Sequence, residues 1–215
     1  MDQIDTFYFI NLDRRTDRLK QITGEFEKME IPFQKIIRIQ AFEHKIGIFA
    51  CGKSHIIAIN HFIESGKNQC MIFEDDFEFT ETKEKVNEVL TNIFSSGAEI
   101  DCLMLAGNDN CVLSFDPTQN TLAQRIFFAT CPSCYVLTKK YAPGLLNNLS
   151  EGAAKQEKWI NAFGEPENAF NNDYYWIYEQ MCRKYYFTVP KLGRQRDSPS
   201  DITPTSKVTM ISLKM

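Results

Sequence analysis

The sequence of 215 residues has no apolar run long enough to cross a membrane, and it carries no excess of positive charge. Its first residues, Met1 to Asp5, do not form a basic segment followed by an apolar one, so no secretory signal is expected. The formal net charge of -4 argues against general electrostatic binding to nucleic acid. We therefore expect a cytoplasmic protein without a transmembrane segment, or one bound peripherally at a membrane surface.

The seven cysteines form no recognisable disulfide or zinc framework, because their number is odd and their spacing is irregular. The C-x-x-C motif from Cys131 to Cys134 has no second pair that would complete a zinc site. A redox motif of this type normally opens a helix, whereas this one runs into the strand-like stretch Tyr135–Thr138. We expect reduced, buried thiols, and a thiol or zinc protein built on Cys131 and Cys134 remains an alternative.

Composition and patterning predict a single α/β domain spanning residues 1–215. Hydrophobic residues make up 43% of the chain and charged residues 24%, which is an ordinary globular balance. In the first half, strand-like and helix-like segments alternate, which predicts a mostly parallel central sheet with helices on both faces. The predicted strands are 6–10, 33–39, 69–73 and 101–105, and the predicted helices are 14–29, 51–65 and 82–94.

The second half has a different pattern, which predicts a smaller antiparallel part. Its predicted edge or antiparallel strands are 112–115, 125–129 and 134–138, and its predicted helices are 140–149 and 173–185. Residues 151–172 are polar and poorly periodic, so we expect a loop or lid there. The tail from 191 to 205 contains prolines and many polar residues, so we expect it to be extended.

Three carboxylates follow a buried strand directly: Met71, Ile72 and Phe73 precede Glu74, Asp75 and Asp76. Adjacent carboxylates repel one another, and burying them costs free energy unless a cation neutralises them. Ligands of open α/β sheets bind beyond the carboxyl ends of the strands. The cluster therefore predicts a site for a divalent cation and a diphosphate, the alternative being a solvated acidic turn.

Strand alternation would place Glu74 and Asp76 on one side and Asp75 on the other. This favours Asp76 as a direct metal ligand, with Glu74 or Asp75 holding a ribose or a metal-bound water. Because alternation often fails where a strand ends, Asp75 stays a candidate as well. Oxygen ligands suit manganese or magnesium equally.

Basic and polar residues that follow the first strand are candidates for binding phosphate. Arg14 and Arg18 lie four positions apart, on one face of the predicted helix, and planar guanidinium groups recognise phosphate well. The alternative for Arg15 and Arg18 is surface pairing with neighbouring aspartates. Asn11 lies at the end of the first strand, where its side chain would bond a nucleotide base.

Three further residues are candidates, two for anion binding and one for catalysis. Ser54 and His55 lie near a predicted helix start, whose backbone N–H groups favour an anion; the alternative is a core histidine. Asp173, at a predicted helix start, is the best-placed carboxylate for a general base. Its alternative role is that of a helix cap. In the polar tail, Gln195 and Asp201 would fold back toward the metal.

Four segments in order resemble glycosyltransferase family 25. Phe9–Leu19 is similar to the opening strand, turn and helix of that family, and Ile72–Asp76 is similar to its Leu-Glu-Asp-Asp motif. Cys51–Ile56 resembles its Gly-Cys-x-x-Ser-His motif with the Gly and Cys exchanged, and Gln195 with Ser200–Ile202 resembles its C-terminal motif. The linker between Ala41 and Gly47 is shorter than is usual in the family.

The resemblance implies a GT-A-like nucleotide-binding fold, with residues 1–107 as the donor-binding half and 108–215 as the acceptor-side half and tail. It implies an inverting, metal-dependent hexosyltransferase that moves galactose or glucose from a UDP-sugar to a hydroxyl on a glycan, a lipid-linked saccharide or a glycoprotein, with Mn2+ or Mg2+ as cofactor. A catalytically silent module that binds nucleotide sugars is the alternative. The expected metal ligands are Glu74, Asp76 and Asp201, the expected donor-binding residues are Asn11, Arg14, Arg18, Ser54, His55, Asp75 and Gln195, and the expected base is Asp173.

Overall fold

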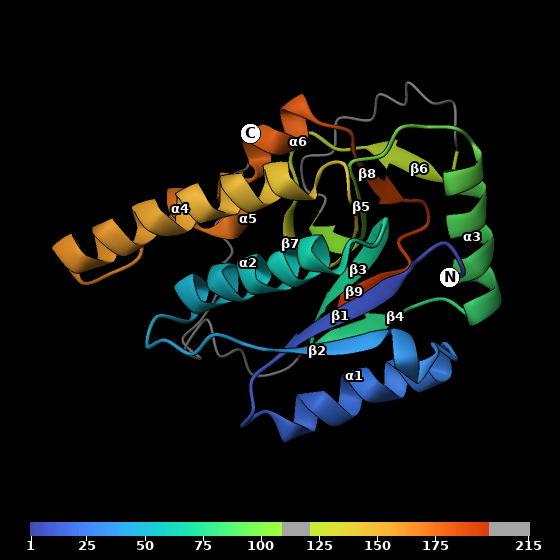
Figure 1. Ribbon diagram of the computed structural model, residues 1–215, viewed down its shortest axis with the longest axis horizontal. Helices are drawn as coiled ribbons and strands as arrows, with labels where there is room; N and C mark the ends of the chain where they lie inside the picture. Colours follow the sequence, from blue (N-terminus) through green and yellow to red (C-terminus); the bar gives the residue numbers. More distant parts are fainter. Residues whose placement is uncertain (109–120, 198–215) are drawn as a thin grey trace, which may run out of the picture.

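A seven-stranded sheet forms the centre of the molecule in the computed structural model, which describes residues 1–108 and 121–197 (Figure 1). Across the sheet, the strands are β2 (Ile36–Gln40), β1 (Thr6–Asn11), β3 (Gln69–Glu74), β7 (Thr130–Thr138), β5 (Cys102–Asn108), β8 (Tyr185–Thr188) and β6 (Ala123–Arg125). Five of them run in one direction, and β7 and β6 run against them. A separate antiparallel pair joins β4 (Phe77–Phe79) to β9 (Gly193–Gln195).

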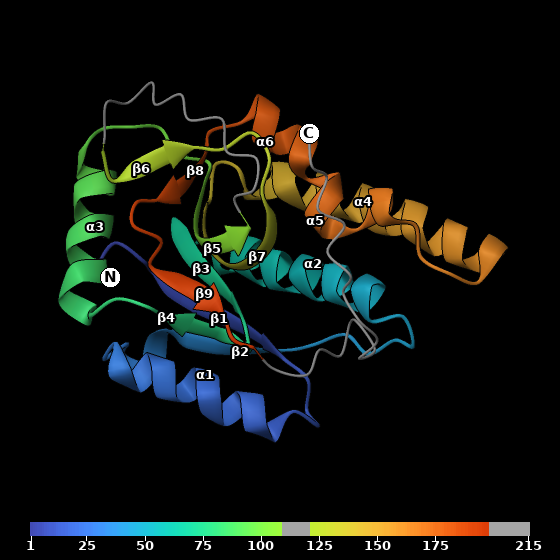
Figure 2. The ribbon, with the colours of Figure 1, turned by 180° about the vertical axis from the view of Figure 1, so that it is seen from behind.

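Helices cover both faces of this sheet, as the two views in Figures 1 and 2 show. The helices are α1 (Thr16–Lys28), α2 (Gly47–Ser65), α3 (Lys83–Ser95), α4 (Ala142–Phe163), α5 (Asn172–Tyr175) and α6 (Ile177–Cys182), with single 3-10 turns at Phe33–Lys35 and Asn168–Phe170. Side chains alternate along β1: Phe7 and Phe9 enter a core shared with α1 and α3. Tyr8 and Ile10 enter a second core, which is shared with α2 and α4. Full burial of one large apolar side chain contributes about 1.5–3 kcal/mol, so these two cores hold the layers together.

The predicted fold class is confirmed: the chain is an α/β protein with a mostly parallel central sheet, helices on both faces and a smaller antiparallel part. The first strand, the strand before the carboxylates and the helix at 82–94 lie where the sequence predicts them. The predicted strand 112–115 lies outside the described residues. Among the helices of the described residues, none is both long and apolar enough to span a bilayer.

Several predictions for the second half were wrong. Residues 151–163 continue α4 and do not form a loop, because Gly152, Gln156 and Ile160 extend its buried face, and the left-handed Gly164 (φ 82°) ends it. The segment predicted as one helix over 173–185 divides into α5 and α6, and Tyr185 already begins β8. The strand predicted at 125–129 lies instead at Ala123–Arg125.

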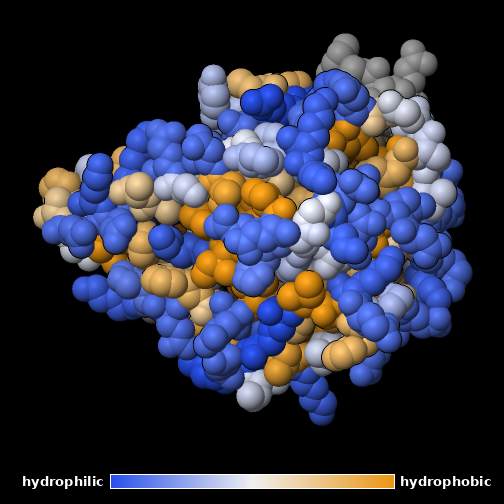
Figure 3. Space-filling view, in the orientation of Figure 1, coloured by the Kyte–Doolittle hydropathy of each residue, from blue (hydrophilic) through white to orange (hydrophobic). Residues whose placement is uncertain are grey.

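Helix α2 begins one turn earlier than the sequence predicts, at Gly47 rather than Cys51. It packs beside α4 over one face of the sheet (Figure 1). The face in Figure 3 is largely hydrophilic, and apolar side chains gather in its middle, around α2 and between α2 and α4. The early start matters for the site, because it places Ser54 and His55 well inside the helix.

The carboxyl ends of β1, β2 and β3 meet at one edge of the sheet because these strands are parallel. Here Asn11 pairs in register with Gln40, and Ile10 with Glu74. The chain turns after Glu74 and enters β4, where Phe77 pairs with Gln195 of β9. Gly193 makes this pairing possible, because a Cβ there would lie 2.1 Å from the ring of Phe77. The short sheet thereby carries a C-terminal strand to the turn that contains Asp75 and Asp76.

Candidate functional site

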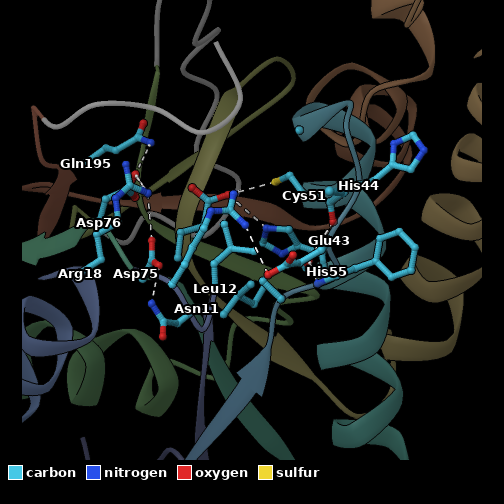
Figure 4. A pocket seen from close by; sticks show the side chains of 18 residues that line it. Asn11, Leu12, Arg18, Glu43, His44, Cys51, His55, Asp75, Asp76 and Gln195 are labelled. Carbon is cyan, nitrogen blue, oxygen red and sulfur yellow. Dashed lines mark hydrogen bonds and ion pairs between the residues drawn. The ribbon is translucent and has the colours of Figure 1, made fainter. Parts of the chain in front are cut away.

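A cavity opens at this edge of the sheet, between the end of β1, the end of β3 and the first turns of α2. It gathers residues that the sequence placed in separate motifs, and Figure 4 shows their side chains from close by. Every described residue that was expected to bind the donor or the metal lines it: Asn11, Arg14, Arg18, Ser54, His55, Glu74, Asp75, Asp76 and Gln195.

Arg18 holds the two aspartates of the acidic turn together. Its Nη1 lies 3.0 Å from Oδ1 of Asp75 and 3.0 Å from Oδ2 of Asp76, and its side chain is only 10% exposed. Asn11 Nδ2 donates to Oδ2 of Asp75 at 2.7 Å, and Gln195 Nε2 donates to Oδ2 of Asp76 at 3.0 Å. Surface pairing, the alternative considered for Arg18, is therefore wrong, and a solvated acidic turn is wrong as well.

Burial is the main influence on the acidity of these carboxyl groups. It raises the pKa of Asp76 to about 6, with the neighbouring Glu74 charge adding to the rise and Arg18 opposing it. Burial also raises the pKa of Asp75, while Asn11 and Arg18 lower it. The turn is thus a concentration of negative charge that one guanidinium neutralises in part.

Glu74 is directed away from this pair and toward α2. Its Oε1 lies 3.2 Å from His55 Nε2 and accepts a 3.4 Å hydrogen bond from Cys51 Sγ. The prediction that Glu74 and Asp76 share one side was wrong, because strand geometry ends at Glu74 and the next two residues form a turn. Asp75 and Asp76 therefore face Arg18 together.

The helix-start role predicted for Ser54 and His55 was also wrong, since both lie two turns inside α2. Ser54 Oγ donates to the Ala50 carbonyl at 2.8 Å and accepts from the Phe42 N–H at 2.9 Å, which fastens the preceding loop to the helix. His55 is buried, with Nδ1 3.0 Å from Tyr135 Oη. The core-histidine alternative describes it in part, although its ring also reaches the cavity.

Asn11 lines the cavity and links the acidic turn to β2. Its Nδ2 donates to Asp75, and its Oδ1 accepts from Arg38 Nη2 at 2.8 Å. Its side chain is therefore engaged within the protein, which favours positioning of the acidic turn over direct contact with a base. Arg38 itself was not predicted; it lies in the middle of β2, the parallel strand beside β1.

Arg14 lies at the entrance, where solvent competes for its charge, whereas the side chain of Arg15 is mostly buried. Arg14 Nη1 lies 3.3 Å from Glu43, and both side chains are more than half exposed. Arg15 pairs with Asp17 at 2.9 Å, which agrees with the surface pairing considered for it. Glu43 belongs to the loop 41–46, whose residues Ala41, Phe42 and His44 also line the cavity and were not predicted.

Asp173 lies outside the set of residues that line the cavity. It stands in the first turn of α5, Asn171 is the residue that precedes that helix, and Oδ2 of Asp173 accepts from the Cys131 N–H at 3.0 Å. The cap alternative is therefore wrong. Burial raises the pKa of Asp173, and the Glu74 charge raises it further. Asp201, the third expected metal ligand, lies outside the described residues.

The C-x-x-C motif does not form a paired site. Cys134 is buried, and burial holds its pKa well above the ordinary value. Cys131 is half-buried, accepts a 3.2 Å hydrogen bond from Asn108 Nδ2, and has its pKa raised by burial to about 12. The cysteines of the described residues are free thiols, but the prediction that they are buried was wrong for Cys182, which is exposed, and for Cys51 and Cys131, which are half-buried.

One carboxylate oxygen in the cavity fits a hard divalent cation. Asp76 is only 4% exposed, and its Oδ1 has no hydrogen-bond partner among the described residues, whereas Oδ2 is held by Arg18 and Gln195. Mg2+ and similar ions are commonly held by one or two carboxylates and complete their shell with substrate phosphates and water. Asp76 therefore fits as a ligand, whereas Glu74 would have to turn from His55 to join it.

No family model matches the chain, and no curated protein matches its sequence. Among solved structures, it is similar to a glycosyltransferase involved in the glycosylation of the major capsid of PBCV-1, with a TM-score of 0.51 and 10% identity over 91% of this chain and 93% of that one. It is also similar to mannose-1-phosphate geranyltransferase from Thermus thermophilus, with a TM-score of 0.48 and 7% identity over 90% and 74%. The first of these shows a glycosyltransferase-like fold.

Proposed function

We propose that this protein is an inverting, metal-dependent hexosyltransferase that moves galactose or glucose from a UDP-sugar to a hydroxyl group on a glycan, a lipid-linked saccharide or a glycoprotein. The observation that carries the proposal is the convergence on one cavity of residues from four sequence segments, of which the fourth is represented by Gln195. Those segments resemble the motifs of glycosyltransferase family 25, and membership of that family is part of the proposal. The glycosyltransferase-like fold supports it.

The charged residues at the entrance suit the diphosphate of such a donor. Exposed ion pairs contribute about 0–1 kcal/mol, so the pair between Arg14 and Glu43 opens at little cost. Arg14 would then bind phosphate oxygens with its planar donors. Arg18, by contrast, is held between Asp75 and Asp76 and acts as a positioning residue.

Asp76 would hold the cation, Mn2+ or Mg2+, through Oδ1. When bound, such a cation stabilises the negative charge that grows on the leaving diphosphate. Arg18 and Gln195 hold the other oxygen of Asp76, which fixes the direction of Oδ1. Glu74 and Asp201 are the further ligands that the proposal includes.

Asp173 would act as the general base, accepting the proton of the acceptor hydroxyl. Its raised pKa makes its carboxylate a better proton acceptor than an exposed aspartate. The Cys131 N–H fixes Oδ2, so the carboxylate is oriented by backbone and does not depend on a mobile side chain.

Release of UDP from a panel of UDP-sugars, with Mn2+ or Mg2+ and a mixture of hydroxyl acceptors, tests the proposal. We expect turnover with at least one hexose donor, loss of turnover on chelation, and loss in Asp76→Asn. Asp17→Asn is the matched control, because this carboxylate is exposed and pairs at the surface; its turnover should be unchanged. UDP binding without turnover for any donor would support the silent binding module and overturn the enzymatic proposal.

A further inference from the structure

Three different metal-binding atoms converge beside the proposed donor site. Cys51 Sγ, His55 Nε2 and a carboxylate oxygen of Glu74 all lie within 4.8 Å of one another. The distance from Glu74 Oε1 is 3.2 Å to His55 Nε2 and 3.4 Å to Cys51 Sγ. No residue of this trio other than Glu74 was expected to bind a metal.

The fold explains the convergence. Cys51 and His55 are four positions apart, so they lie on one face of α2. Glu74 ends β3, and strand alternation gives it the same side as Ile72, which belongs to the core beneath α2. All three residues line the cavity, and Figure 4 shows Cys51 and His55 together on its α2 side, apart from Asp75, Asp76 and Gln195.

Two of the three distances between the ligand atoms fit a small tetrahedral ion. Bonds of about 2.0–2.3 Å from zinc to oxygen, nitrogen and sulfur give tetrahedral edges of about 3.3–3.8 Å. The two distances from Glu74 Oε1 are close to that range. Thiolate and imidazole are ligands that select ions softer than magnesium or manganese.

Two of the three proposed ligands are oriented by hydrogen bonds with neighbouring residues, as is common for metal ligands. A metal-binding histidine normally bonds a second group through its other ring nitrogen. His55 does this through Nδ1, which lies 3.0 Å from Tyr135 Oη, and the residue is 2% exposed. Asn172 Nδ2 donates to Cys51 Sγ at 3.9 Å, so the sulfur is also oriented.

The local charge favours binding of a cation. Burial raises the pKa of the Cys51 thiol well above its ordinary value, and Glu74, Asp173 and Asp76 raise it further. Glu74, which accepts the hydrogen bond of the thiol, and the nearby carboxyl groups of Asp173 and Asp76 thus place negative charge around the sulfur. A bound dication would reverse this repulsion and release the thiol proton to solvent, as metal binding to thiols does.

We propose that Cys51, His55 and Glu74 form a site for a borderline-soft divalent cation such as Zn2+, with its fourth position open to the cavity. Three protein ligands and one open position are typical of sites where a water or substrate completes the shell. The cation at this site would be a different one from the cation held by Asp76, but Glu74 is a proposed ligand of both. Occupancy by zinc would therefore withdraw Glu74 from a hard cation bound at Asp76.

Titration of the whole protein with Co2+, a spectroscopic substitute for Zn2+, tests this site without any enzymatic assay. We expect one equivalent to give a thiolate-to-cobalt charge-transfer band with intense d–d absorption typical of a tetrahedral ion, and Zn2+ to abolish both. Cys51→Ser should lose the charge-transfer band, and Glu74→Gln should bind cobalt at least tenfold more weakly. Cys131→Ser and Cys182→Ser are the matched controls and should retain the wild-type spectrum.

Thermal unfolding of each apo variant separates loss of ligand from loss of fold. Absence of a sulfur band in the wild type, or its persistence in Cys51→Ser, would overturn the site. Loss of the band in Cys131→Ser would show that the sulfur ligand belongs to the C-x-x-C motif, and this result would also overturn the site at Cys51. None of these outcomes depends on UDP-sugar turnover, so the site and the proposed function fail or stand separately.

Discussion

Gln195 donates a 3.0 Å hydrogen bond to Asp76, although 119 positions separate the two residues. The pairing of β4 with β9 produces this contact, because it places Gln195 opposite Phe77, the residue after Asp76. The backbone adds a second link, since the Arg196 N–H donates to the Asp76 carbonyl at 2.7 Å. The end of the described chain therefore helps to shape the acidic turn.

Replacing Gln195 with Ala should weaken Mn2+ binding, because Oδ2 of Asp76 would be held by Arg18 alone. Loss of such an orienting partner typically costs 10–100-fold in metal affinity. Calorimetric titration of Mn2+ in the presence of UDP measures it. Arg194→Ala is the control on the same strand, because its side chain is 70% exposed and pairs with Glu78; an equal loss in both variants would contradict the role assigned to Gln195.

Replacing Arg18 with Met should destabilise the fold, because two buried carboxylates would lose their shared cation. Breaking a buried ion pair from one side costs about 3–5 kcal/mol. Urea unfolding measures the loss. Arg14→Met should change stability by less than about 1 kcal/mol, since its pair is exposed, yet it should weaken UDP binding. Equal stability of both variants would show that Arg18 does not neutralise the turn.

Replacing Asp173 with Asn should lower turnover about 10²–10⁴-fold, the range for loss of a general base, and leave the affinity for the donor unchanged. The amide oxygen of Asn still accepts from the Cys131 N–H, so the fold should persist. Steady-state kinetics together with UDP titration separate the two effects. Unaltered turnover would assign the base to another residue.

Replacing Gly193 with Ala should separate β4 from β9. The added Cβ would lie 2.1 Å from the Phe77 ring and 2.8 Å from the Glu78 carbonyl, and overpacking of this kind costs about 1–3 kcal/mol. Gly24→Ala is the opposite case, because nothing lies within 4 Å of the new Cβ in α1. That change should stabilise the helix by about 0.5–1 kcal/mol. Denaturant titration of both variants checks the contrast.

The sequence predicted the residues of the cavity better than their contacts. Strand–helix alternation placed Asn11 and Glu74 at the ends of strands of one mostly parallel sheet, which is enough to bring them to the same edge; the adjacency of the two strands comes from the structure. It did not predict that Asp75 and Asp76 both lie in a turn after the strand, because the residues that hold them there, Arg18 and Gln195, are distant in the sequence.

The second half was harder to predict because tertiary packing overrides its local pattern. The continuation of α4 past Glu151 depends on a narrow buried stripe, which the polar residues around Gln156 conceal. Tyr185 opens a strand that pairs with β5, and the aromatic and β-branched residues of Tyr185–Thr188 were a usable local signal for it. The metal-binding capacity of Cys51 was missed for a related reason: its partner Glu74 comes from another element.

The place of β7 makes the two halves of the chain mutually dependent. This strand lies between β3 and β5, so residues 1–107 alone would leave a gap in the sheet beside the strand that carries Glu74. Formation of that sheet must await contacts between residues distant in sequence, and topologies of this kind fold slowly. A fragment that ends at residue 107 should expose one edge of β3 and both edges of β5, and it should aggregate rather than bind nucleotide.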